Sequence, residues 1–399
     1  MKFLFDDGSF SFETLRAAGF AVDGGADLGE ILVTAAAIGN GDEDAWHREW
    51  KATAQRVHAL AQKSLERSHP VSAREAFLRA SNYYRAAEFF RRVDPANDPE
   101  VRALSKLSRE TFMNAAALMD GPVEDVSIPC GQHTLPAYLF LVDRSGKQRP
   151  TVIYNNGFDS TREEAYFAIA AAALRRGYNV LAFDGPGQGA VIREDGVPFR
   201  PDWETVITPV LDFAAKRSEF AKDKIALFGY SFGALLVARA AAFDKRPAAL
   251  ILDDGMYDFF DANSASMPPF FVEWIRHARD DVVVLPVLQL LIRMNRAVRW
   301  GLRNGVWTFG AKSCADYLRL CTSYTLEGIA HRIACPTLVM EADEDKFLEG
   351  QAQRVAAALK CPTTLVTLRA SEGAGEHTHA GAPRRAHRTM FDWLDAIFY

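Results

Sequence analysis

Residues 229–233 read GYSFG and match the pattern G-x-S-x-G around Ser231. The apolar run KIALFGY that leads into this pattern is typical of a buried strand, and the run FGALLVARAAAF that follows favours a helix. A glycine on each side of the serine permits a sharp turn from strand to helix, which holds the hydroxyl group above a sheet. We therefore predict that Ser231 is a nucleophile; the alternative is a serine that only caps the helix.

A serine hydroxyl is a weak nucleophile near neutral pH and requires a histidine base that an acidic side chain orients. At a strand–turn–helix site of this kind, the chain order is serine, acid, histidine. His377 and His379 lie in the glycine-rich segment SEGAGEHTHAGAP, directly after the apolar run TTLVTLRA, where the base is expected. The H-x-H pair could instead bind a metal ion, but no third ligand stands at a familiar spacing. We therefore predict a base in this loop and no metal site.

The acidic partner is expected at the end of the preceding apolar run, in PTLVMEADEDKF. Asp343, Glu344 and Asp345 all lie there, and one of the three is expected to be only a solvated loop charge. Asp345 lies in the turn that opens the next helix. We therefore predict that Asp345 is the acid, with Asp343 as the alternative.

Attack on a carbonyl group places negative charge on its oxygen, and backbone N–H groups commonly stabilise that charge. The N–H of Phe232, directly after the serine, is the first predicted donor. The second is the N–H of Phe158 in the loop NNGFDS, where Gly157 lets the backbone turn after the run PTVIY. Asp159 and Ser160 are expected to hold this loop in place.

Two further segments follow apolar runs. The segment FDGPGQGA at 183–190 resembles a glycine-rich nucleotide loop, but its glycines are too closely spaced for G-x-G-x-x-G and it lacks the lysine of a P-loop. It therefore predicts a tight turn beside the site. The acid-rich segment LILDDGMYDFFDA contains Asp254 and Asp258, which we predict to contact the substrate together with Tyr230, the residue before the serine. Some of the other acidic residues in this segment are expected to be solvated.

From about residue 123 onward, short apolar runs alternate with helical segments, as in βαβ units. This alternation predicts an α/β fold with a mostly parallel sheet flanked by helices, in which reactive groups gather at the carboxyl ends of the strands. We place a catalytic domain at 123–399, with an insertion at about 256–325 that is rich in Phe, Trp, Leu and Met. The insertion is expected to form an apolar lid, or else to pack against the N-terminal domain or a second subunit.

The first part of the chain has apolar residues at helical spacing, so we predict a helical N-terminal domain at 1–122. Segment 42–68 carries apolar side chains at spacings of three or four residues, the pattern of an amphipathic helix. The next helix is expected to begin with Ser72 as its cap and Glu75 completing a capping box. A third helix is expected to have Pro99 in its first turn. Aromatic side chains of these helices could wall a substrate cavity.

Composition excludes several classes of protein. The 399 residues carry a net charge of −5, which argues against nucleic acid or an acidic membrane surface as a partner. No apolar run reaches the length of about 18 residues that a membrane helix needs. The first residues, MKFLFDDGSFSFE, contain acidic side chains where a signal peptide has its apolar stretch. We therefore expect no signal peptide and predict a cytoplasmic location. The five cysteines form no CxxC, so we expect no disulfide framework, no structural zinc and no cofactor.

With Ser231, Asp345 and a histidine in the loop at 371–383, the chain resembles the α/β-hydrolase superfamily. It is most similar to the branch of the bacterial 2,6-dihydroxypseudooxynicotine hydrolases and the fungal hydrolases that shorten polyketide pigment precursors. The stretches that carry this resemblance are SAREAFLRASNYYRAAEFF, NNGFDSTREEAY, FDGPGQG, GYSFGA and EGAGEHTHAG. In that family the catalytic histidine directly follows an acidic residue, which favours His377, after Glu376, over His379.

The resemblance implies a serine triad that cleaves a carbon–carbon bond next to a ketone in an aromatic or polyketide-like small molecule. It also implies a homodimer. The nicotine-type relatives use an acidic residue shortly after the nucleophile strand, for which this chain offers only aspartates at 253–261. Neighbouring branches cleave esters, so a carboxylesterase or acyltransferase with the same triad is the alternative. A non-catalytic binding protein on the same scaffold is a third hypothesis.

Overall fold

Eight strands form one sheet in the computed structural model, which describes residues 1–265, 267–277 and 281–399. Their order is β1-β2-β4-β3-β5-β6-β7-β8; β2 pairs antiparallel with β1 and β4, and the other neighbours pair in parallel. The strands are β1 (Val123–Cys130), β2 (His133–Phe140), β3 (Arg149–Asn155), β4 (Asn179–Phe183), β5 (Phe220–Tyr230), β6 (Ala249–Asp253), β7 (Thr337–Ala342) and β8 (Thr363–Leu368). The predicted α/β fold with a mostly parallel sheet is confirmed.

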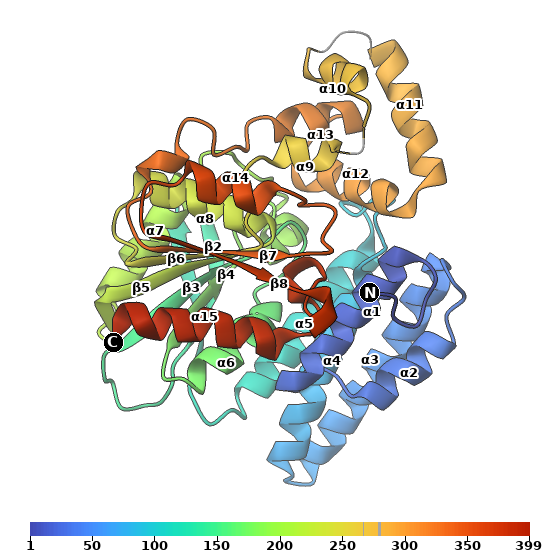
Figure 1. Ribbon diagram of the computed structural model, residues 1–399. Coiled ribbons are helices and arrows are strands. Elements are labelled where there is room, and N and C mark those ends of the chain that lie inside the picture. Colours follow the sequence, from blue (N-terminus) through green and yellow to red (C-terminus); the bar gives the residue numbers. More distant parts are fainter. Residues whose placement is uncertain (266, 278–280) are drawn as a thin grey trace.

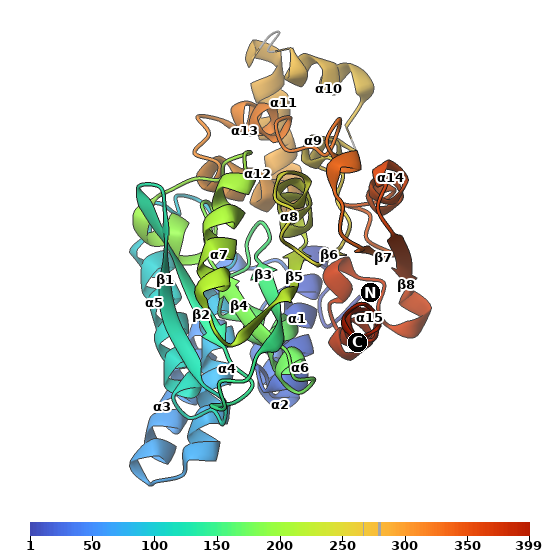
Figure 2. The same cartoon turned by 90° about the vertical axis from the view of Figure 1, so that its left-hand side faces the viewer.

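Helices cover both faces of this sheet (Figures 1 and 2). Successive side chains of a strand point to opposite faces, so Val152 and Tyr154 of β3 join one apolar core and Ile153 joins the other. Over the face of Ile153 lie α7 (Glu204–Lys216), α8 (Phe232–Phe243) and α14 (Gln351–Ala358). Over the face of Val152 lie α6 (Ala171–Leu174), which follows a π-helical turn, and α15 (Pro383–Phe398). Both faces are therefore buried, as a parallel sheet requires.

Five helices precede the sheet: α1 (Gly8–Gly19), α2 (Leu28–Ala36), α3 (Glu43–Glu66), α4 (Pro70–Glu88) and α5 (Pro99–Ala116). Their core is continuous with the sheet, because Phe112 of α5 stacks on Tyr138 of β2 with ring centroids 5.2 Å apart. Trp46 and Trp50 of the predicted apolar stripe on α3 are fully buried. The predicted boundary at residue 122 falls between α5 and β1, and the division into domains stays a prediction.

The start of α4 differs from the predicted Ser72 cap. The helix begins at Pro70, His69 is its N-cap residue, and no side chain caps it. Proline has no N–H to leave unpaired and its fixed φ suits a first turn, so the helix starts two residues before the serine. Helix α5, in contrast, begins at the predicted Pro99, and the Asp98 side chain accepts a hydrogen bond from a first-turn N–H.

The insertion between β6 and β7 consists of α9 (Phe259–Ser264), α10 (Pro269–Arg276), α11 (Asp281–Met294), α12 (Arg296–Thr308) and α13 (Cys314–Cys321). These helices form a group of their own above the sheet in the view of Figure 1. Helix α12 is attached to the N-terminal region: Trp300 stacks on Phe89 with ring centroids 4.5 Å apart, and Arg296 forms ion pairs with Asp7 and Glu43. The N-terminal region and the insertion therefore meet above the strand ends.

The predicted insertion at 256–325 includes residues 266 and 278–280, which lie outside the described residues. Its predicted role as a lid stays a prediction. None of the helices in the described ranges combines the length and the apolarity needed to cross a membrane.

Candidate active site

Ser231 lies at the turn between β5 and α8. Its backbone has a φ of 57°, which is uncommon for residues other than glycine and persists only where the surroundings impose it. A Cβ atom on Gly229 would lie 2.4 Å from the carbonyl oxygen of Gly233, and one on Gly233 would lie 2.5 Å from that of Asn156, so both positions require glycine. The Ser231 side chain makes no capping bond to α8. The geometry is the predicted strained turn, and the helix-cap alternative is wrong.

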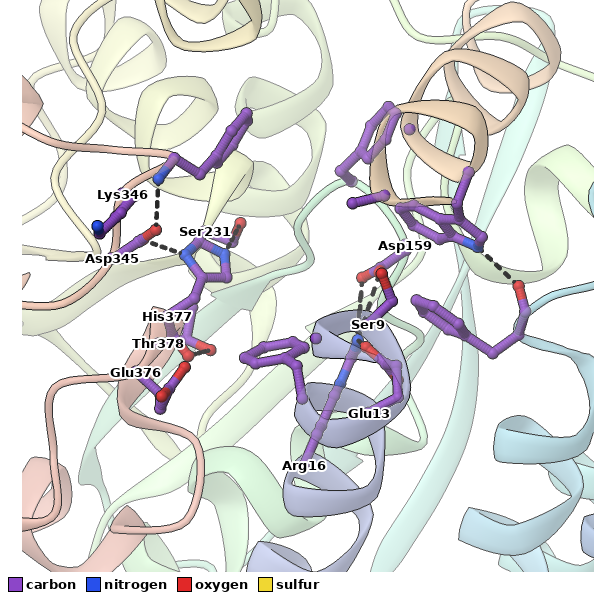
Figure 3. A pocket seen from close by; sticks show the side chains of 18 of the residues that line it. Ser9, Glu13, Arg16, Asp159, Ser231, Asp345, Lys346, Glu376, His377 and Thr378 are labelled. Carbon is purple, nitrogen blue, oxygen red and sulfur yellow. Dashed lines mark hydrogen bonds and ion pairs between the residues drawn. The ribbon is translucent and has the colours of Figure 1, made fainter. Parts of the chain in front are cut away.

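A line of two hydrogen bonds joins Ser231 to His377 and Asp345 (Figure 3). The Oγ of Ser231 lies 2.7 Å from Nε2 of His377, and Nδ1 of His377 lies 2.5 Å from Oδ2 of Asp345. Asp345 follows β7, and its other carboxylate oxygen accepts the N–H of Phe347 at 3.0 Å. The strand ends thus bring a hydroxyl, an imidazole and a carboxylate together in the order that proton transfer from the serine requires.

The Asp345 carboxylate controls the proton on His377. Burial alone would lower the pKa of His377, but the charge and hydrogen bond of Asp345, with a further contribution from Asp254, raise that pKa to about 9. Burial alone would raise the pKa of Asp345, whereas the charge and hydrogen bond of His377 hold it below its usual value. Because Nδ1–H donates to Asp345, Nε2 of the neutral imidazole is left to accept the serine proton.

The other predicted candidates for the base and the acid make different contacts. Nδ1 of His379 donates to the carbonyl oxygen of Ala374 at 2.9 Å, and its Nε2 lies 3.1 Å from the Asp253 carboxylate. Asp343 accepts the N–H of Ala370 at 2.7 Å. Among the described residues, neither His379 nor Asp343 contacts Ser231, so the geometry favours His377 and Asp345.

The loop with the second predicted oxyanion donor packs directly on the serine turn. A Cβ atom on Gly157 would lie 2.7 Å from the carbonyl oxygen of Tyr230 and 3.1 Å from Cβ of Ser231. Gly157 has no positive φ, so the position requires glycine for this close approach and not for the predicted turn. Among the described residues, no hydrogen bond outside the helices and strands uses the N–H of Phe158 or Phe232, so both remain candidate oxyanion donors.

The three residues predicted to contact the substrate lie in different environments. Tyr230 lines the cavity beside Ser231. Asp254 is only 1% exposed and does not line it; its Oδ2 accepts the N–H of Thr378 at 2.9 Å and lies 3.5 Å from Nδ1 of His377. Asp258 caps α9 by accepting the N–H of Asp261 and lies outside the cavity lining. The structure therefore brings Tyr230, but not the two aspartates, to the cavity.

Asp253, Asp254 and His379 form a second buried cluster, whose ligand-type atoms lie within 4.8 Å of one another. Burial raises the pKa of Asp254 to about 7, with Asp253 adding to the effect. Burial would lower the pKa of His379, but the two aspartates raise it to about 9. The geometry fits an internal ion pair behind the loop of His377.

A cavity of about 740 Å³ opens in front of Ser231 and His377. Aromatic side chains line it from the N-terminal region, the loop after β3, the serine turn, the insertion and the loop after β7: Phe12, Phe89, Phe90, Phe158, Tyr230, Phe232, Phe259, Trp300 and Phe347. Polar side chains of α1 also reach it. Arg16 lies within 3.3 Å of Asp159, which follows Phe158, and Figure 3 shows this pair beside the same cavity as the serine. The cavity is therefore lined by the N-terminal region, the insertion and the loops at the strand ends.

Helix α1 and its residues Glu13 and Arg16 were not among the predicted features of the cavity. Asp7, a common N-cap residue, precedes the apolar run and accepts two first-turn N–H groups, so this signal could have revealed the helix. Nothing in the local sequence indicates that the helix borders the cavity, because Arg16 and Asp159 are 143 residues apart.

The sequence matches two protein families and several fungal hydrolases. The profile of the Alpha/beta hydrolase family matches residues 156–389, and that of the Esterase FrsA-like family matches residues 30–272. Hydrolase LUC6 of Fusarium sp is 37% identical, over all of this chain and 98% of the relative. The 20-hydroxy-prefusarin hydrolase FUS2 of Gibberella moniliformis is 36% identical, with the same coverage of both chains.

Solved structures share the fold. The crystal structure of the 2,6-dihydroxy-pseudo-oxynicotine hydrolase superposes with a TM-score of 0.75 over 95% of both chains, at 20% sequence identity. A structure named AbyA5 Wildtype has a TM-score of 0.63, over 92% of this chain and 88% of its own, at 14% identity. The family profile covers more than half of the chain, and the fungal relatives match it over its whole length. The chain therefore belongs to the alpha/beta hydrolase family, and it is a hydrolase of that type.

Proposed function

We propose that the protein is a serine hydrolase in which Ser231, His377 and Asp345 form the catalytic triad. The observation that carries this proposal is the unbroken line of hydrogen bonds from Ser231 Oγ through the imidazole to Asp345. His377 takes the hydroxyl proton while Ser231 Oγ forms a bond to a substrate carbonyl carbon. The N–H groups of Phe158 and Phe232 then bind the oxyanion.

We further propose that the bond broken is a carbon–carbon bond next to a ketone. When the tetrahedral intermediate collapses, the electron pair of that bond moves to the leaving carbon, which an adjacent carbonyl or phenol group stabilises. His377 donates the proton that it holds to this carbon. Water then attacks the acyl–serine ester and gives one proton to His377, which returns it to Ser231 Oγ as the carboxylic acid leaves. One water molecule is consumed in each turnover.

The cavity supports an aromatic or polyketide-like substrate. Its volume of about 740 Å³ suits a drug-sized molecule, and the aromatic side chains of its wall offer apolar faces for packing. FUS2, a relative that matches over the full length, is named as a hydrolase of 20-hydroxy-prefusarin. We propose that the present chain acts on a bulky apolar small molecule.

Ester cleavage or acyl transfer with the same triad is the second candidate. The match of residues 30–272 to the Esterase FrsA-like family favours it, because this match includes helices α3 to α5 as well as the serine turn. In this case the leaving group is an alcohol and needs no neighbouring ketone. An aryl β-diketone such as benzoylacetone and an ester such as p-nitrophenyl butyrate separate the two candidates.

The Ser231→Ala variant tests the proposal. We expect turnover of whichever probe the wild-type protein cleaves to fall by about 10³-fold or more, with the fold unchanged by circular dichroism. A variant that keeps near-normal turnover would show that Ser231 is not the nucleophile. Turnover of the β-diketone supports carbon–carbon cleavage, and turnover of the ester alone supports the second candidate.

A further inference from the structure

The glycine-rich turn at 183–190 contacts the loop that carries Phe158. Gln188 of this turn has a buried side chain, only 1% exposed, and all its polar atoms are engaged. Its Nε2 donates to the carbonyl oxygen of Asn156 at 2.6 Å and to that of Gly157 at 3.1 Å. Its Oε1 accepts the N–H of Gly185 at 3.0 Å, within its own turn. The carboxamide is therefore fixed in one orientation between the two loops.

The bond to Gly157 acts on the peptide group that contains the N–H of Phe158. The carbonyl of Gly157 and the N–H of Phe158 belong to the same peptide unit, which is planar and trans. In a trans peptide, C=O and N–H point in opposite directions. Gln188 therefore holds the carbonyl on its own side and directs the Phe158 N–H to the opposite side. The Cα of Gly157, next to this peptide, packs against the serine turn: a Cβ atom there would lie 3.1 Å from Cβ of Ser231.

Other contacts of this loop act on neighbouring peptide groups. Ser160 Oγ accepts the N–H of Gly157 at 2.8 Å, which belongs to the preceding peptide, and the Asn304 amide approaches the carbonyl of Phe158 at 3.4 Å, which belongs to the following one. Within the described ranges, Gln188 is the side chain that bonds the peptide between Gly157 and Phe158. We propose that Gln188 is a positioning residue that aims the Phe158 N–H at the oxyanion, an inference that rests on the proposed function.

The test compares Gln188→Met with Gln351→Met. Methionine has nearly the shape of glutamine but donates no hydrogen bond, so Gln188→Met releases both carbonyls. Gln351 is a matched control: it is 5% exposed, and its side chain likewise holds two backbone groups, the N–H of Tyr257 and that of Asp258, outside the cavity lining. Both substitutions are expected to lower the melting temperature. Gln188→Asn, which keeps the amide but shortens the side chain, is a second variant if methionine prevents folding.

The measurement is the rate of phosphonylation by a fluorophosphonate probe, analysed as a maximal rate constant and an apparent binding constant. This reaction develops negative charge on the phosphoryl oxygen, so it depends on the oxyanion donors. We expect the maximal rate constant to fall about tenfold or more in both Gln188 variants, less than the about 10²–10³-fold cost of losing a donor outright. The apparent binding constant of the Gln188 variants should stay within about twofold of the wild-type value. Both constants of Gln351→Met should also stay within about twofold of wild type.

The outcomes separate this inference from the proposed function. If the wild-type protein is labelled at Ser231 but the Gln188 variants keep the wild-type maximal rate, the positioning role is wrong and the triad stands. The same holds if only the binding constant changes, or if Gln351→Met slows labelling as much as Gln188→Met, because the effect then follows lost stability. If the wild-type protein is not labelled, the proposed function itself fails.

Discussion

The guanidinium group of Arg16 in helix α1 forms an ion pair with Asp159, the residue after the proposed oxyanion donor Phe158. Arg16 also binds the carboxylate of Glu164 at 2.9–3.0 Å, and its side chain is only 6% exposed. Burial would raise the pKa of Asp159, but Arg16 holds it below its usual value, so this pair is charged. An N-terminal helix therefore helps to fix a loop of the candidate active site.

Replacement of Arg16 by methionine should destabilise the protein strongly. The substitution removes the shared partner of the buried Glu164 carboxylate, which keeps Arg85 at 3.4 Å, and of the partly exposed Asp159 carboxylate. We therefore expect a cost toward the lower end of the about 3–5 kcal/mol for breaking a buried ion pair. The measurement is the free energy of unfolding in urea. The control is Arg48→Met, because Arg48 is 64% exposed beside Glu49 and should change this free energy by less than about 1 kcal/mol. Equal effects in the two variants would contradict the assigned role of the Arg16 pair.

The two candidate acids after β7 should respond differently to the same substitution. Asp345→Asn removes the carboxylate charge that orients the His377 imidazole and stabilises its protonated form. We expect turnover to fall by about 10⁴-fold, as for the loss of this charge in a serine protease triad. Asp343→Asn alters a carboxylate that accepts the N–H of Ala370 in a loop and, within the described residues, does not contact Ser231 or His377, so turnover should change by less than about threefold. Steady-state rates with p-nitrophenyl butyrate or benzoylacetone provide the comparison. A large loss in the Asp343 variant alone would reverse the assignment.

The pH dependence should report the proton on His377. Only the deprotonated imidazole can accept the serine proton, so kcat/KM should rise with pH, with a midpoint above the usual histidine value of 6.5 and toward about 9. The Asp254 carboxylate, 3.5 Å from Nδ1 of His377, contributes to the raised pKa. Asp254→Asn should therefore move the midpoint to lower pH, because protonated His377 loses a stabilising charge.

Asp202→Asn is the matched control for this shift, because Asp202 pairs with Arg200 at the surface and does not contact His377. Its pH profile should coincide with that of the wild-type protein. A midpoint that is unchanged, or higher, in the Asp254 variant would show that this carboxylate does not act on the base.

Trp300 should determine the preference for large apolar substrates. Its ring stacks on Phe89 in the cavity wall and its indole N–H donates to the carbonyl oxygen of Phe89 at 2.8 Å. In Trp300→Ala, KM for p-nitrophenyl octanoate should rise about tenfold, equivalent to about 1.4 kcal/mol, while KM for p-nitrophenyl acetate changes by less than about threefold. Trp274→Ala, on the exposed side of α10, is the control. Equal changes for the two esters would show that Trp300 does not contact the acyl chain.

Much of the framework was predictable because its signals are local. The eight strands match short apolar runs, and Ser231 is revealed by five consecutive residues between a strand and a helix. Asp345 and His377 were predicted because reactive groups lie at strand ends. In the structure His377 contacts Ser231, and Asp345 contacts His377. Their catalytic roles, like the homodimer and the cytoplasmic location, stay proposals.

The remaining features depend on contacts between distant parts of the chain. The turn at 183–190 was predicted only as a tight turn beside the site, because its effect on Phe158 depends on where Gln188 meets the loop after β3. Asp254 was predicted to contact the substrate from its place at a strand end, yet its side chain lies behind His377, bonded to the N–H of Thr378. Side-chain direction at a strand end is set by the neighbouring loops, which short patterns do not encode.

Mass spectrometry of the protein treated with a fluorophosphonate shows whether Ser231 is an activated nucleophile. We predict one adduct per chain, located on the peptide that contains Ser231, absent in Ser231→Ala and formed far more slowly in His377→Ala. A wild-type protein that stays unmodified, or an adduct that persists in Ser231→Ala, would contradict the account.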